Sequence, residues 1–129
     1  MSKNTNRLLY FVGMLLIFSS AIIASTMNST NLYLDHAGSK TLSVKIILDN
    51  KVLFEGLIKQ SKRMPPIVYS KILNLSAGSH NLKFEDRTRR ISEEKKFLSP
   101  DIKTIFIKTE KDLLTKTHIV LETKDISVK

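Results

Sequence analysis

The chain has 129 residues, a hydrophobic fraction of 42% and a formal net charge of +9, so it has room for one folded domain and is not a disordered polar chain. It contains no cysteine, which excludes disulfides, thiol nucleophiles and zinc sites built on thiolates. The excess of lysine and arginine indicates attraction to polyanions, although basic side chains also keep the edges of β-sheets soluble.

Residues 1–27 are predicted to form a membrane-targeting helix. Residues 8–27 carry no charge, and as a helix they would reach about 30 Å, the thickness of the hydrocarbon core of a bilayer. Lys3 and Arg7 precede this stretch, whereas residues 28–39 contain no lysine or arginine, so the positive-inside rule places the N-terminus in the cytoplasm and the rest of the chain outside it. The side chains expected to face the membrane are Leu8, Phe11, Leu15, Ile17, Phe18, Ile22 and Ile23.

The targeting helix has two alternative fates. Ser19-Ser20-Ala21 provides small residues at which a signal peptidase could cut, which would release a secreted or periplasmic protein. Ile22 and Ile23 continue the apolar run past that site, which favours an uncleaved anchor. We therefore expect a single-pass protein of the cytoplasmic (inner) membrane with its C-terminal part outside the cytoplasm.

After a short linker, residues 28–40, the pattern predicts one extracytoplasmic β-domain over residues 41–129. Short runs rich in Ile, Val, Leu, Phe and Thr alternate with turn residues, as is typical of strands. The expected strands are 41–48, 51–58, 67–75, 80–85, 103–109 and 117–123. The polar segment 87–97 fits either a further strand or a long loop. Six or seven strands without an amphipathic helix predict a mainly β fold, a small antiparallel sandwich of immunoglobulin-like size.

Two turns of this domain resemble those of a known class of module. Asp49-Asn50 between two predicted strands favours a hairpin, with Gly56 in the second strand, and Gly78-Ser79-His80 follows later. Over about 40 residues this pattern resembles extracytoplasmic bacterial β-sandwich modules of the PEGA type. The resemblance implies a small surface-layer or periplasmic module used for contact with proteins or glycans.

One cluster of basic residues is a candidate contact site. Arginine forks suit the recognition of phosphate and carboxylate groups. Loops that carry them could touch lipid headgroups if they face the membrane, or an acidic partner if they face away. The candidate residues are Arg87, Arg89, Arg90, Lys95 and Lys96 in one segment and Lys62 and Arg63 in another.

The sequence contains no motif that indicates catalysis, a metal or another cofactor. His36, His80 and His118 lack the spacing of metal ligands, and the acidic residues mostly neighbour lysine or arginine, as on a solvated surface. We therefore predict a non-enzymatic, membrane-anchored interaction module without cofactors that serves as an accessory or assembly subunit of a larger envelope complex. The alternative is a module that binds an anionic glycan or lipid headgroup through residues 87–96. Nucleic acid is not an expected partner, since the domain is predicted to be exported.

Overall fold

The computed structural model describes residues 27–123. The predicted membrane helix, residues 1–26 of it, lies outside the described residues, and so does the C-terminal segment 124–129. Within residues 27–123 no helix is long and apolar enough to cross a membrane.

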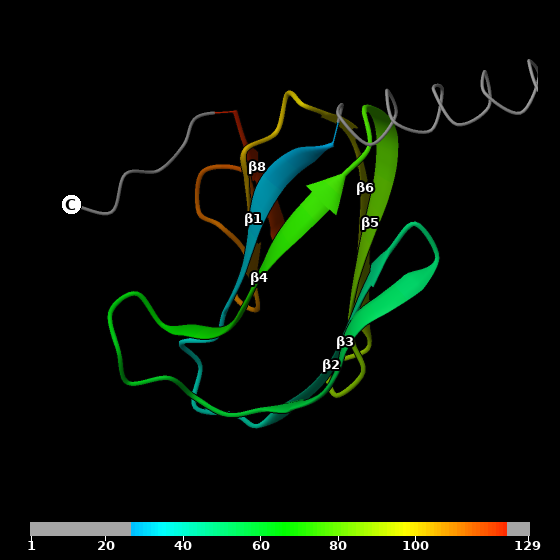
Figure 1. The fold of residues 1–129 in the computed structure, drawn as a ribbon. Helices are drawn as coiled ribbons and strands as arrows, with labels where there is room; N and C mark the ends of the chain where they lie inside the picture. The colour runs from blue at the N-terminus through cyan, green and yellow to red at the C-terminus, as the bar shows by residue number, and fades with distance from the viewer. Residues whose placement is uncertain (1–26, 124–129) are drawn as a thin grey trace, which may run out of the picture.

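The described chain is mainly β and contains eight strands in two four-stranded sheets. The strands are β1 (Asn28–Asp35), β2 (Leu42–Leu48), β3 (Lys51–Ile58), β4 (Ile67–Leu75), β5 (Gly78–Asp86), β6 (Ile91–Ser99), β7 (Thr104–Lys108) and β8 (Ile119–Glu122). One sheet has the order β4-β1-β7-β8 and the other the order β3-β2-β5-β6. Figure 1 shows the sheets facing each other, with β1, β4 and β8 on one side and β2, β3, β5 and β6 on the other.

The interpretation of residues 28–40 as a linker is wrong for its first eight residues. Residues 28–35 form β1, which pairs with β4 on one side and with β7 on the other. Asn and Ser have low strand propensity, so the local sequence Asn-Ser-Thr-Asn hides this strand. Thr30, Leu32 and Leu34 nevertheless alternate into the core, and this burial outweighs the weak propensity.

Pairing directions are mostly antiparallel, as expected, with one exception. β1 and β7 run parallel, in the register Leu32↔Ile105. Because parallel neighbours cannot be joined by a tight turn, the two strands are far apart in the sequence. The predicted β2–β3 hairpin is confirmed: Leu48 pairs with Lys51, and both intervening residues have positive φ, as a type I′ turn requires.

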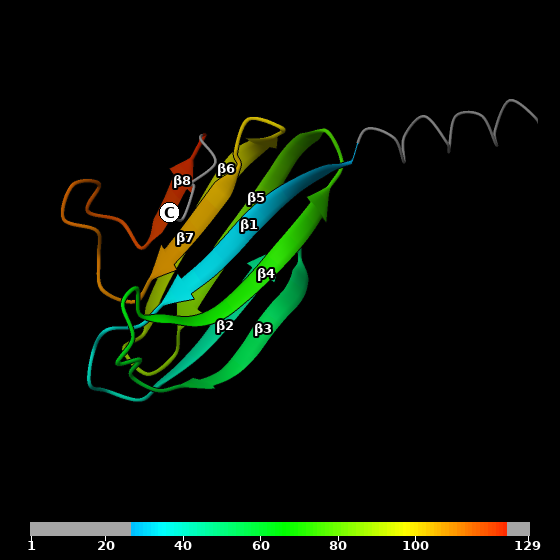
Figure 2. The ribbon, with the colours of Figure 1, turned by 60° about the vertical axis from the view of Figure 1, so that its left-hand side comes forward.

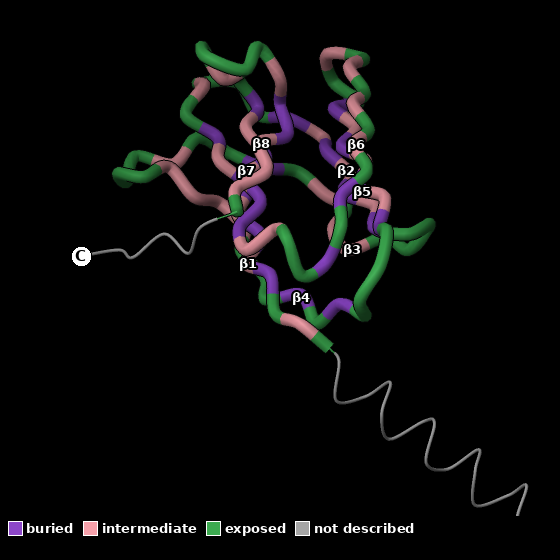
Figure 3. Tube along the Cα trace, turned by 90° about the horizontal axis from the view of Figure 1, so that it is seen from above, coloured by how far each residue is buried: buried purple, intermediate pink, exposed green. Residues whose placement is uncertain are grey.

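A single core lies between the two sheets. Apolar side chains alternate inward along the strands, so that residues of both sheets are buried against each other (Figure 3). The buried apolar residues are Leu32, Leu34, Leu42, Val44, Ile46, Leu48, Ile58, Leu73, Leu75, Leu82, Phe84, Phe97, Ile105, Ile107 and Ile119. The segment 87–97, which the sequence left open, contributes a real strand, because Phe97 of β6 belongs to this core.

Candidate functional site

Four connections between strands lie at the same end of the molecule, which we call the distal end. They are residues 36–41, 59–66, 87–90 and 109–118, named here the distal loops. The pairing registers require this arrangement, because Ile58 pairs with Leu42, Ile67 with Asp35, Asp86 with Val44, and Lys108 with Asp35. β1 starts at the opposite end and points toward the distal loops, as Figure 2 shows.

The positive charge of the described chain is concentrated in the distal loops. These loops contain nine lysine and arginine residues and two acidic residues, whereas the eight strands contain seven of each sign. The connections at the other end, residues 49–50, 76–77 and 100–103, contain one basic and two acidic residues. The domain is therefore electrically polarised along its strands, and an anionic partner would be attracted to the distal end.

Hydrogen bonds tie the distal loops to one another. The buried ring of His36 contacts the Thr109 hydroxyl through Nδ1 at 2.7 Å and the Lys40 carbonyl through Nε2 at 2.6 Å. The backbone N–H of Ser61 donates to the His36 carbonyl at 3.1 Å. Since a carbonyl only accepts, Nε2 carries a proton, and in the neutral ring Nδ1 accepts from the threonine hydroxyl. His36 thus joins three of the four distal loops.

Arg89 joins the turn 87–90 to loop 109–118. Its Nε donates to the carboxylate of Asp86 at 2.5 Å, and Nη1 donates to Glu110 at 3.0 Å. Its Nη2 also donates to the Thr109 carbonyl. Burial by itself lowers the pKa of Arg89, but the hydrogen bond and charge of Asp86 outweigh it and raise the pKa above its ordinary value. Arg89 therefore has a structural role, with its guanidinium committed inside the protein.

The structure separates the basic residues of the segment 87–96 into different surroundings. Arg87 makes an exposed ion pair with Glu55 at 2.8 Å. Lys95 faces inward on β6 and donates to the carbonyl of Ile119 in β8 at 2.7 Å. Lys96 is exposed on the outer face of β6, away from the distal loops. Proximity in the sequence therefore does not produce one continuous binding patch.

The remaining predicted residues do lie together at the distal end. Lys62 and Arg63 are in loop 59–66 and Arg90 is in the turn 87–90, and all three are exposed. Seven exposed basic side chains of the distal loops have no acidic partner among residues 27–123: Lys40, Lys59, Lys62, Arg63, Arg90, Lys111 and Lys116. Four of these were not singled out from the sequence, because isolated lysines in separate loops give no local signal.

Loop 109–118 also presents two leucines to solvent. Leu113 and Leu114 are each 93% exposed. Asp112 holds the turn that carries them, because its carboxylate accepts hydrogen bonds from the backbone N–H groups of Leu114 and Thr115 and pairs with Lys108 at 2.9 Å. These interactions lower the pKa of Asp112 to about 2. The third of the most exposed apolar side chains, Met64, is 92% exposed and lies in another distal loop, beside Arg63.

The histidines are all used within the fold. His80 contacts the Asp49 carboxylate through Nδ1 at 2.6 Å and the Ser76 carbonyl through Nε2 at 2.7 Å. Burial by itself lowers the pKa of His80, but the bonds to these two acceptors outweigh it and raise the pKa. His118 donates from Nδ1 to the Lys108 carbonyl, and its Nε2 is buried. Among residues 27–123 no group of three potential metal ligands occurs.

Comparison with protein-family models, curated proteins and solved structures finds no match to this chain.

Proposed function

We propose that the protein is a non-enzymatic, membrane-tethered interaction module of the cell envelope. Its described part is a small β-sandwich that works outside the cytoplasm, and the distal loops bind an acidic partner protein. In this role the protein is an accessory or assembly subunit of a larger complex.

The observation that carries this proposal is the charge polarity of the domain. Nine basic residues against two acidic ones lie in the four distal loops, while the strands are balanced. Lysines that only kept the protein soluble would be spread over both ends and both sheets. Their collection at one end supports a docking surface for a negatively charged partner.

The position of β1 supports an orientation for the tethered domain. β1 begins at Asn28, directly after the apolar stretch that we predict to span the membrane. Eight residues of strand at about 3.3 Å each separate its two ends by roughly 26 Å. A domain held in this way points its distal loops away from the anchoring bilayer, toward a partner in the envelope.

The bonding of the histidines supports a non-enzymatic role. A general base needs a ring nitrogen that can reach a substrate. Both nitrogens of His36 and of His80 already contact protein groups, and the second nitrogen of His118 is buried. The Asp49–His80 pair therefore stabilises the fold and has no free nitrogen for catalysis.

The proposal is tested by neutralising the distal loops. We expect the full-length Lys62→Gln/Arg63→Gln/Arg90→Gln/Lys111→Gln variant to bind immobilised polyglutamate at least about tenfold more weakly than the wild type at low salt, because local charge steers anionic partners. The matched control Lys45→Gln/Lys83→Gln/Lys96→Gln/Lys103→Gln removes the same charge elsewhere. Equal weakening by both variants would show that net charge alone drives binding, and the distal surface would be rejected.

An anionic lipid or glycan is the alternative partner. The exposed side chains of Met64, Leu113 and Leu114 lie in the same loops as the unpaired basic residues, an arrangement that suits insertion into the surface of an anionic bilayer other than the anchoring one. The same variants, held in neutral nanodiscs and mixed with phosphatidylglycerol vesicles, separate the two partners. Binding to vesicles without binding to polyglutamate would favour the lipid.

A further inference from the structure

The edge strands of the two sheets lie on two lateral sides of the domain. The two sides differ in whether side chains bond to the outward backbone groups of these edge strands. On one side β6 and β8 are adjacent, and side chains of β6 occupy the edge of β8. The Glu93 carboxylate accepts the backbone N–H groups of His118 at 3.1 Å and Ile119 at 2.6 Å, and Lys95 donates to the Ile119 carbonyl. Because both backbone groups of Ile119 are already bonded, the start of β8 is less available to another strand.

On the other side, the edges of β3 and β4 are open. β4 pairs with β1 alone and β3 pairs with β2 alone. Among residues 27–123, one hydrogen bond links these two strands: the Tyr69 hydroxyl donates to the Leu53 carbonyl at 3.4 Å. Tyr69 also packs on Phe54, with ring centroids 4.7 Å apart. The nine-residue edge of β4 is longer than the eight-residue edge of β3 beside it.

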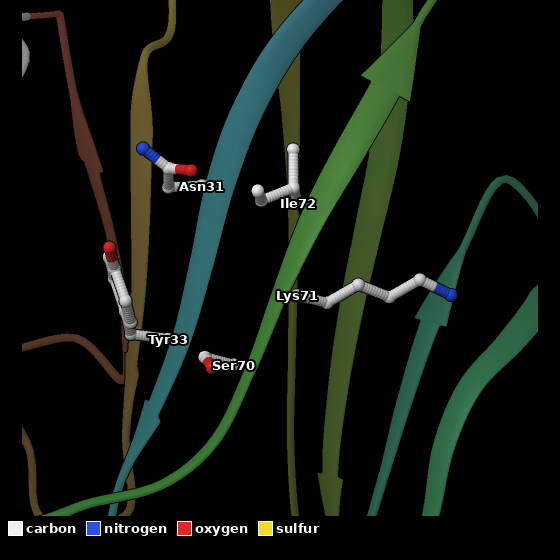
Figure 4. A pocket seen from close by; sticks show the side chains of 5 residues that line it. All are labelled: Asn31, Tyr33, Ser70, Lys71 and Ile72. Carbon is white, nitrogen blue, oxygen red and sulfur yellow. The ribbon is translucent and has the colours of Figure 1, made fainter.

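Lys71 lies at the centre of β4 and gives this edge a positive charge. Figure 4 shows its side chain pointing toward β3, away from Ser70 and Ile72. Its ammonium group has no acidic partner within residues 27–123. β4 contains no acidic residue, and β1 contains only Asp35, which pairs with Ile67 at the far end of the strand. An unpaired positive charge thus lies halfway along an open strand edge.

The outer side of the same edge is hollowed and presents one exposed aliphatic side chain in the lining of the hollow. Ile72 is 64% exposed there. A hollow of about 400 Å³ lies beside it, lined by Asn31, Tyr33, Ser70, Lys71 and Ile72. A strand that paired with β4 would direct alternate side chains toward Lys71 and toward Ile72.

We propose that the free edge of β4 accepts an extended acidic segment of the partner protein as a fifth strand of its sheet. The backbone of the segment bonds to β4, one carboxylate faces Lys71, and the neighbouring apolar side chain packs on Ile72. This inference rests on the proposed function, in that the partner is acidic. A second copy of the chain is a poor occupant, because antiparallel pairing of all nine residues of β4 with its copy sets the two Lys71 side chains opposite each other.

The test uses the full-length protein and a labelled peptide of alternating Val and Glu, nine residues long to match β4. We expect saturable binding by fluorescence anisotropy and slower amide exchange in β4. Lys71→Glu should weaken binding at least about tenfold and create binding of the corresponding Val–Lys peptide, because the charge at the edge is reversed. Lys45→Glu, the same change on the inner strand β2, is the matched control, with circular dichroism to show that both variants fold.

Three outcomes would overturn the inference: no binding of the Val–Glu peptide, equal weakening by Lys71→Glu and Lys45→Glu, or unchanged exchange in β4. The polyglutamate experiment remains independent. If distal variants lose polyglutamate while Lys71→Glu leaves the peptide bound, the edge inference fails and the proposed function stands. If Lys71→Glu reverses peptide selectivity while the distal variants bind normally, the edge stands and the distal surface fails.

Discussion

Arg87 and Arg89 lie in the same turn. Comparing their variants tests how burial changes the contribution of an ion pair to the free energy of unfolding. The Asp86 side chain is fully buried and its charge is compensated by Arg89, whereas the Arg87–Glu55 pair has both side chains nearly half exposed. Arg89→Ala leaves a buried carboxylate without its partner, which typically costs about 3–5 kcal/mol. Arg87→Ala removes an exposed pair, whose typical value is about 0–1 kcal/mol.

For a domain of this size, a loss of 1 kcal/mol lowers the unfolding midpoint by about 4–8 °C. We therefore expect Arg89→Ala to lower the midpoint by at least about 12 °C and Arg87→Ala by less than about 8 °C. Thermal unfolding of the full-length chain, followed by circular dichroism, measures both. Arg89→Lys should fall between them, because lysine keeps the charge but loses the fork that reaches Asp86, Glu110 and the Thr109 carbonyl. Equal shifts for Arg87→Ala and Arg89→Ala would refute the reasoning.

Four further predictions test other parts of the structure. The raised pKa of His80 means that its stabilising effect is complete below its ordinary pKa of 6.5 and is lost as pH rises through the folded value; denaturant titrations should show this loss in the wild type and not in His80→Gln. Glu93→Ala should cost about 1–3 kcal/mol and speed amide exchange at His118 and Ile119, whereas Lys96→Ala should do neither. Asp112→Ala should speed exchange at Leu114 and Thr115, and an unchanged rate there would show that Asp112 does not hold the turn. Because the chain lacks cysteine, Ser92→Cys introduces a single thiol that reports the membrane topology. We expect a membrane-impermeant maleimide to label this thiol from outside the cytoplasm. Labelling only after lysis would contradict the predicted orientation.

Strand formation was largely readable from local patterns. The segments 51–58 and 67–75 form β3 and β4 with the expected bounds, because each is rich in apolar and β-branched or aromatic residues and is bounded by turn residues or proline. β1 was missed, since its burial depends on β4 and β7, which lie far along the chain. A strand of weak propensity is recognisable only when its neighbours are known.

The candidate surface was predictable only in part. Composition alone indicates a basic protein with an affinity for anions, and the position of Lys62 and Arg63 in a loop follows from local sequence, whereas local sequence left the segment of Arg90 open as strand or loop. Local sequence could not show that Arg89 and Lys95 are committed to internal partners, because Asp86, Glu110 and the Ile119 carbonyl reach them only after the strands pair.

The sequence by itself therefore determined the mainly β class, most of the strands, the β2–β3 turn and the overall positive charge. These depend on neighbouring residues, whose spacing sets which side chains share a face. Only the tertiary structure decided that four separate loops collect the charge at one end, and that side chains of β6 bond to the backbone of β8 while the β4 edge is open. These properties come from pairing between distant strands, and local periodicity carries no information about which strands become neighbours.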